Sequence, residues 1–139
     1  MSMPKVFTML GTSHIEVLVS AADSGDAVSV IAESCEPGGG PPPHIHTRED
    51  EFLMPLQGGF EYFNGTDWGP MPREGVFTKR GNLHSWRKGK DGPGKILVVT
   101  TPGGFERFMF ALRDVRLPDG LPTLISVSAD YGISYPQLA

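Results

Sequence analysis

Short apolar segments recur along most of the chain, and turn residues separate them. The first two cover 15–19 and 27–35, and the second is rich in β-branched residues and is followed by Pro37. Five more follow at close spacing: 51–56, 60–63, 76–78, 83–86 and 96–100. The turn residues between them are Gly58-Gly59, Asn64-Gly65, Gly69-Pro70 and Asp91-Gly92. Many short strands joined by tight turns predict a β-sandwich or β-barrel rather than alternating strands and helices.

The hydrophobic pattern changes after Gly104. Within 105–114 the apolar residues recur at helical spacing: Phe105, Phe108, Met109 and Leu112. A second helical register follows at Leu121, Leu124, Ile125 and Ser128, and Gly132 would cap this helix. We therefore expect two short helices, packed on the outside or the end of the strand-built part.

Composition supports an all-β protein. Of the 139 residues, 18 are Gly and 13 are Pro, and helices tolerate neither residue well in their interiors. The length suits one hydrophobic core. We expect a single domain over 1–139, with a barrel core over about 15–104 and a helical C-terminal tail over about 105–139.

Charge and hydropathy exclude two classes of partner. The net charge of −4 argues against nucleic acid, which requires a basic surface to replace counterions. The basic residues that do cluster are interrupted by Gly and Asn: Lys79, Arg80, Arg87, Lys88 and Lys90. No stretch approaches the roughly 20 apolar residues of a membrane span, and the N-terminal residues do not resemble a signal peptide. We expect a cytoplasmic protein whose single cysteine, Cys35, is a buried and inert thiol.

The segment His44-Ile45-His46 brings together residues that can carry chemistry. Alternate side chains of a strand face the same side, so both imidazoles would point into a barrel. Two such histidines can bind one metal at about 2.0–2.1 Å, and Glu51 can add a carboxylate after a small bend. This ligand set is common for divalent ions with open coordination positions. By itself His-x-His is a weak signal, and surface histidines are the alternative; we assign no role to His14.

The spacing around these residues is more specific. Gly38 lies six residues before His44, and Gly58 lies seven residues after Glu51. With four residues between His46 and Glu51, this order resembles the first signature motif of the cupin superfamily.

A second segment resembles the second cupin motif more loosely. That motif reads Pro-x-Gly-x-x-His, with an Asn four residues after the His. Here Gly81 and His84 match, Lys79 replaces the proline, and Lys88 stands where the Asn is expected. The resemblance implies that His84 supplies a third imidazole from a neighbouring strand, which completes a metal site of His44, His46, Glu51 and His84.

Two further segments, 38–46 and 101–108, are similar to the quercetin-dioxygenase-like cupins, as is the Tyr131-Gly132-Ile133 tail. The resemblance implies a double-stranded β-helix, or jelly-roll barrel, that forms a homodimer and holds one divalent transition metal. Fe, Mn, Ni, Cu and Zn all suit imidazole and carboxylate ligands.

Several functions remain open, because cupins with this pattern include dioxygenases, isomerases and ligand sensors. The first hypothesis is a metal-dependent dioxygenase of the quercetinase-like type, acting on a small aromatic or enolic substrate. The alternatives are a non-enzymatic protein that binds a small ligand and a metal-dependent isomerase of a sugar or keto acid. Glu51 could serve as a base if its bond to the metal is reversible. Leu53 shares the face of Glu51 and Trp86 that of His84, so each is either a substrate contact or a plain core residue.

Overall fold

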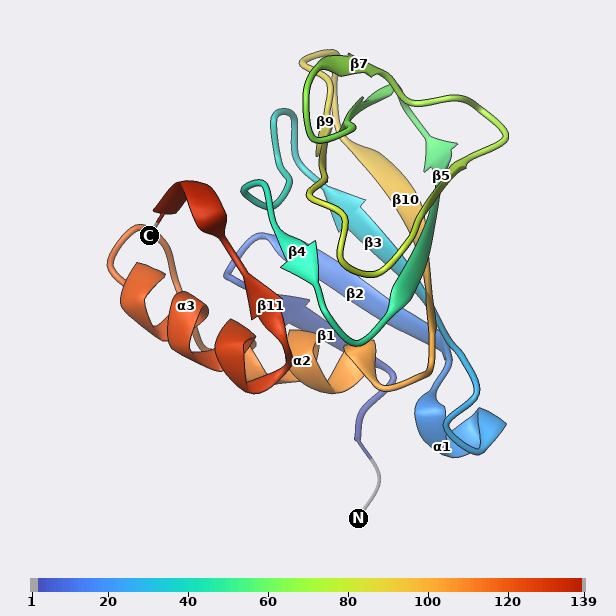
Figure 1. The fold of residues 1–139 in the computed structure, drawn as a ribbon, viewed down its shortest axis with the longest axis vertical. Coiled ribbons are helices and arrows are strands. Elements are labelled where there is room, and N and C mark those ends of the chain that lie inside the picture. Colours follow the sequence, from blue (N-terminus) through green and yellow to red (C-terminus); the bar gives the residue numbers. More distant parts are fainter. Residues whose placement is uncertain (1–2, 139) are drawn as a thin grey trace.

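A computed structural model describes residues 3–138, and most of the elements in it are short strands (Figure 1). The strands are β1 Val6–Met9, β2 Ser13–Val19, β3 Ser29–Cys35, β4 Ile45–His46, β5 Asp50–Gln57, β6 Phe60–Phe63, β7 Trp68–Pro70, β8 Val76–Thr78, β9 Ser85–Lys88, β10 Gly94–Thr101 and β11 Ile133–Ser134. The helices are α1 Ala21–Ser24, α2 Phe105–Ala111 and α3 Leu121–Asp130, followed by the 3-10 turn η1 Pro136–Leu138. The predicted all-β class is confirmed.

The larger sheet has six antiparallel strands in the order β1-β2-β3-β10-β5-β8. Side chains of its central strands point alternately to the two faces, and one face is buried. Fully buried residues on this face are Ile31, Leu53 and Ile96. The register places Thr100 of β10 beside Glu51 of β5.

Two smaller groups of strands face this sheet and complete the barrel. One is β7-β6-β9, and the other is the pair β11-β4. Strands β6 and β7 form the hairpin that Asn64-Gly65 predicts, with Phe63 opposite Trp68. The side chain of Asn64 accepts hydrogen bonds from the backbone of Thr66 and Asp67, both at 2.9 Å, which fixes the turn.

The structure adds elements that the sequence pattern does not predict. The first strand is β1 and not the segment at 15–19, so the sheet begins at Val6. Strand β1 is an edge strand in which only Met9 is buried, so it shows no apolar alternation. Strand β7 consists of Trp-Gly-Pro, a composition tolerated only at an edge.

The C-terminal helices form where the periodicity predicts them and cover one side of the barrel (Figure 1). All four apolar residues of the α2 register are buried: Phe105, Phe108, Met109 and Leu112. In α3, Leu124 and Ser128 are buried, but Ile125 is 37% exposed, so its expected place on the packed face is wrong. None of the helices within residues 3–138 combines the length and the apolarity that crossing a membrane requires.

Candidate metal centre

Backbone hydrogen bonds bring the two histidine segments together. The amide of His44 donates to the carbonyl of His84 at 2.9 Å, and the amide of His84 donates back to His44 at 3.0 Å. The amide of Gly81 donates to the carbonyl of His46 at 2.8 Å. The second motif is thus held against the first one by the main chain, with both His44 and His46 turned inward and buried.

The glycine-rich loop before His44 lies against strand β9. The amide of Gly38 donates to the carbonyl of Lys88 at 2.9 Å, and the amide of Lys88 donates to Gly39 at 2.8 Å. At Gly40 a Cβ atom would lie 2.2 Å from the carbonyl oxygen of Trp86. A residue with a side chain would therefore force the loop away from β9 and shift the strand that carries the histidines.

Glu51 reaches the same point from the large sheet. It lies on β5 between Thr100 of β10 and Thr78 of β8, and it is 3% exposed. Its Oε1 lies 2.8 Å from Nε2 of His84, and its Oε2 lies 3.8 Å from Nε2 of His46.

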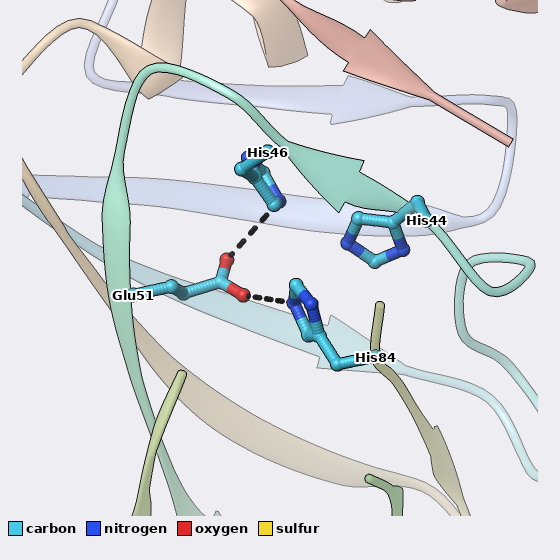
Figure 2. Close-up of side chains that lie close together, drawn as sticks. All are labelled: His44, His46, Glu51 and His84. Atoms are coloured by element: carbon cyan, nitrogen blue, oxygen red, sulfur yellow. Dashed lines mark hydrogen bonds and ion pairs between the residues drawn. The ribbon is translucent and has the colours of Figure 1, made fainter. Parts of the chain in front are cut away.

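The structure brings all four predicted metal ligands into one buried cluster (Figure 2). One potential ligand atom from each residue lies within 4.8 Å of all the others. The imidazole ring centroids are 4.4 Å apart for His44 and His84, 4.9 Å for His44 and His46, and 5.5 Å for His46 and His84. A cluster of this size can hold one metal ion.

Each imidazole is oriented through its other nitrogen. Nδ1 of His44 lies 2.8 Å from the carbonyl oxygen of Pro42, and Nδ1 of His84 lies 3.1 Å from that of Asn82. Nδ1 of His46 lies 3.2 Å from Oε1 of Glu49, which is itself buried. These acceptors favour a proton on every Nδ1 and turn each Nε2 toward the centre of the cluster, where Nε2 of His84 donates a hydrogen bond to Glu51.

The buried titratable groups of the cluster shift one another's pKa values. Burial and, to a smaller extent, the neighbouring His46 and His84 lower the pKa of His44 to about 3. Burial raises the pKa of Glu51, but His46 and His84 outweigh burial and bring it down to about 2. Burial lowers the pKa of His46, yet Glu51 and Glu49 raise it above its ordinary value. The site therefore offers an ionised carboxylate and a neutral His44.

The donor set fits a divalent metal. Nε2 of His46 is one of only two buried side-chain nitrogen or oxygen atoms within residues 3–138 that have no hydrogen-bond partner. An imidazole nitrogen in that position is costly unless something binds it. Three oriented imidazoles and one carboxylate could satisfy this nitrogen by sharing an ion, and they leave open positions on it.

A cavity of about 280 Å³ opens from the cluster. His44, His46 and Glu51 line one part of it. Much of the remaining wall is apolar and comes from the barrel and the two C-terminal helices: Trp86, Val98, Phe105, Phe108, Met109 and Leu124. Helices α2 and α3 thus help to enclose the space in front of the candidate metal ligands.

The other residues singled out from the sequence fall into different places. Trp86 is buried and lines the cavity, whereas Leu53 has no exposed surface and is not part of the cavity wall. Lys79 is exposed. Lys88 is buried, and its ammonium donates to the carbonyl of Gly89 at 3.2 Å. No hydrogen bond or ion pair within residues 3–138 joins either lysine to the four candidate ligands.

Two carboxylates of the site are missed by the sequence reasoning. Glu49 orients His46, and its only sequence signal is its position three residues after that histidine. Glu33 lines the cavity from β3. The alternation Ile31-Glu33-Cys35 could have revealed it, because a charged residue stands where the strand faces the core.

No protein-family model matches the chain, and no curated protein matches it either. Solved structures do match. A sugar phosphate isomerase of the cupin superfamily from Silicibacter pomeroyi is 26% identical, with a TM-score of 0.57, over 66% of this chain and 60% of that protein. The chain thus spans less than two thirds of that isomerase.

Two further matches have lower sequence identity. A cupin 2 domain-containing protein from Halorhodospira halophila is 18% identical, with a TM-score of 0.59, over 88% of this chain and 82% of that one. A predicted oxalate decarboxylase from Thermotoga maritima is 21% identical, with a TM-score of 0.59, over 71% of this chain and 90% of that one. The structural neighbours are cupin-superfamily proteins, and the expected double-stranded β-helix fold is confirmed.

Proposed function

We propose that the protein is a metal-dependent enzyme, with one divalent ion held by His44, His46, Glu51 and His84. The observation that carries this proposal is that Nε2 of buried His46 has no hydrogen-bond partner and faces three further potential ligands. A bound transition metal would supply a Lewis acid and, if redox-active, a route for dioxygen chemistry.

The side chains of the site would divide the work. His44 and His84 are held by the backbone carbonyls of Pro42 and Asn82, so they serve as rigid ligands. Glu51 is the one carboxylate of the cluster, so it is the group that would both hold the metal and accept a proton from an enol or phenol. The apolar wall excludes water from the reacting centre.

The cavity lining indicates the substrate class. No Lys or Arg is among the described residues that line it, whereas Glu33 and Glu36 are. A site built for a phosphate or carboxylate substrate carries such cations, with arginine preferred. The volume of about 280 Å³ lies near the lower end of the usual range for small-molecule sites, about 300–1,000 Å³. We infer a small, uncharged aromatic or enolic substrate.

A dioxygenase reaction suits such a substrate. Both atoms of O₂ enter the product, so no external reductant is required. The test is oxygen uptake by protein reconstituted with Fe(II), Mn(II), Ni(II) or Cu(II), using flavonols and catechol-like diketones. Uptake should be lost in His84→Ala and kept in His14→Ala, since His14 is exposed on the outer face of β2. No uptake with any metal would contradict the dioxygenase proposal.

Isomerisation is the second candidate, because the similarity to the sugar phosphate isomerase covers 66% of this chain. Since no Lys or Arg is among the described residues that line the cavity, the substrate would be an uncharged sugar or ketone. Such a reaction needs a base and a Lewis acid but no oxygen. Turnover under strict anaerobiosis would therefore favour isomerisation over oxygenation, and a tightly retained ligand without turnover would favour a binding protein.

A further inference from the structure

Glu33 is another carboxyl in the cavity, and its backbone position is displaced along the barrel from that of Glu51. It pairs with Ile96 of β10, whereas Glu51 pairs with Thr100 of the same strand. Four residues of extended chain correspond to about 13 Å between the two backbone positions. The two carboxyls therefore enter the cavity at different levels.

The surroundings of Glu33 leave it without a strong protein partner. It is only 4% exposed. The thiol of Cys35 lies 4.0 Å from Oε2, which makes it at most a weak donor, and the Ser13 side chain on β2 lowers the pKa of Glu33 only in part. None of the ion pairs formed within residues 3–138 includes Glu33.

A carboxyl is expensive to bury in this way, so its position calls for a partner. Thr12, Ser13 and Glu36 line the cavity together with Glu33 and make this region polar. The cavity thus has two polar regions, the metal cluster and the Glu33 region, with apolar walls that include Phe105 and Phe108. A ligand that fills it needs a metal-binding group and, apart from that group, a hydrogen-bonding group.

We propose that Glu33 recognises a hydroxyl group on the ligand, remote from the part that binds the metal. The carboxyl accepts a hydrogen bond from this hydroxyl, and Ser13 holds the carboxyl in place. The ligand is thereby defined as an uncharged molecule with chelating oxygens at one end and a hydroxyl at the other. This inference rests on the proposed metal-dependent function.

The test compares two probes that differ by one hydroxyl, 4-methylcatechol and 4-(hydroxymethyl)catechol. Dissociation constants are measured by calorimetry on Zn(II)-loaded protein, because zinc is redox-inert and leaves the catechols intact. The wild type should bind the hydroxymethyl compound about 10-fold more tightly, the usual range for one hydrogen bond. In Glu33→Met the ratio should fall to about 1, and in Glu33→Gln it should lie between these values.

The matched control is Glu16→Gln, which removes an exposed carboxylate from the neighbouring strand and should keep the wild-type ratio. A wild-type ratio near 1, or a ratio unchanged in Glu33→Met, would overturn the role of Glu33. If 4-methylcatechol still binds and requires His84, the metal-dependent function survives that result. If neither catechol binds the wild type, the proposed function is wrong and the inference fails with it.

Discussion

The cavity contains two buried glutamates whose pKa values are shifted in opposite directions. Glu51 and Glu33 are 3% and 4% exposed, so burial alone does not distinguish them. Glu51 lies among three histidines, which lower its pKa to about 2. Burial, together with repulsion from Glu51, outweighs the opposing effect of Ser13 and raises the pKa of Glu33 to about 7.

The difference teaches that neighbours decide what a buried carboxyl can do. Near the histidines a glutamate is a fixed anion, suited to a cation. In the Glu33 region the same side chain is close to half protonated at neutral pH, so it can exchange hydrogen bonds with an uncharged group. One cavity therefore offers two kinds of recognition.

The largest effect is expected at the cluster. His44→Ala and His84→Ala each remove one of four donors and expose a neighbouring group to an unfilled space, so near-stoichiometric metal should be lost from both. Elemental analysis of the purified proteins measures this loss, with His14→Ala as the control that keeps its metal. Equal metal content in all four proteins would place the metal elsewhere.

A smaller effect is expected in the Glu33 region, where stability should depend on pH. The folded pKa of about 7 exceeds the ordinary value of 4.5, so between these pH values the native state binds more protons than the unfolded state. The free energy of unfolding then falls as pH rises, by about 3 kcal/mol at most, and is constant above about pH 8. Glutamine does not titrate, so Glu33→Gln should not show this fall in the free energy of unfolding.

The measurement is denaturant unfolding of metal-free wild type and Glu33→Gln from pH 5 to 8. Because both proteins carry the same histidines, the difference between their free energies isolates Glu33. The variant should gain stability relative to the wild type as the pH rises. A difference that stays constant across this range would show that Glu33 is not shifted.

Glu49→Gln tests whether the second nitrogen of His46 matters to the cluster. Outer partners of this kind change metal affinity by about 10–100-fold, and an amide is a weaker acceptor than a carboxylate. We expect the variant to lose metal affinity by a factor near the lower end of this range, as measured by competition with a chelator. Glu74→Gln, an exposed carboxylate in a loop, should leave the affinity unchanged.

The smallest effect is expected at Tyr135, which lines the cavity near His44. The Tyr135 hydroxyl donates to Oγ of Ser128 at 2.7 Å, and Ser128 donates onward to the carbonyl of Leu124. Tyr135→Phe should cost about 1 kcal/mol in denaturant unfolding and leave the metal content intact. Tyr131→Phe is the control, since its hydroxyl makes no hydrogen bond within residues 3–138. Equal losses in both variants would contradict this assignment.

The cluster could be predicted from the sequence because its information is local. Fixed spacing places His44 and His46 at β4 and Glu51 on the next strand along the chain, β5, and the second motif adds His84. Glu33 could not be assigned in the same way, because its role depends on β2 and on helices far along the chain. Strands β1 and β7 escaped prediction because edge strands show little burial alternation, and Ile125 was misplaced because helical register does not say how wide the packed face is.

The reciprocal backbone pairing of His44 with His84 has a consequence for how the ion is acquired. The main chain aligns these ligands without needing the ion, so the apoprotein should retain its shape and take up or release metal without unfolding. Imidazole and carboxylate donors discriminate weakly among first-row ions, and cellular supply then decides which one is loaded. Under the proposed function, the same polypeptide would thus change its chemistry with the metal that its surroundings provide.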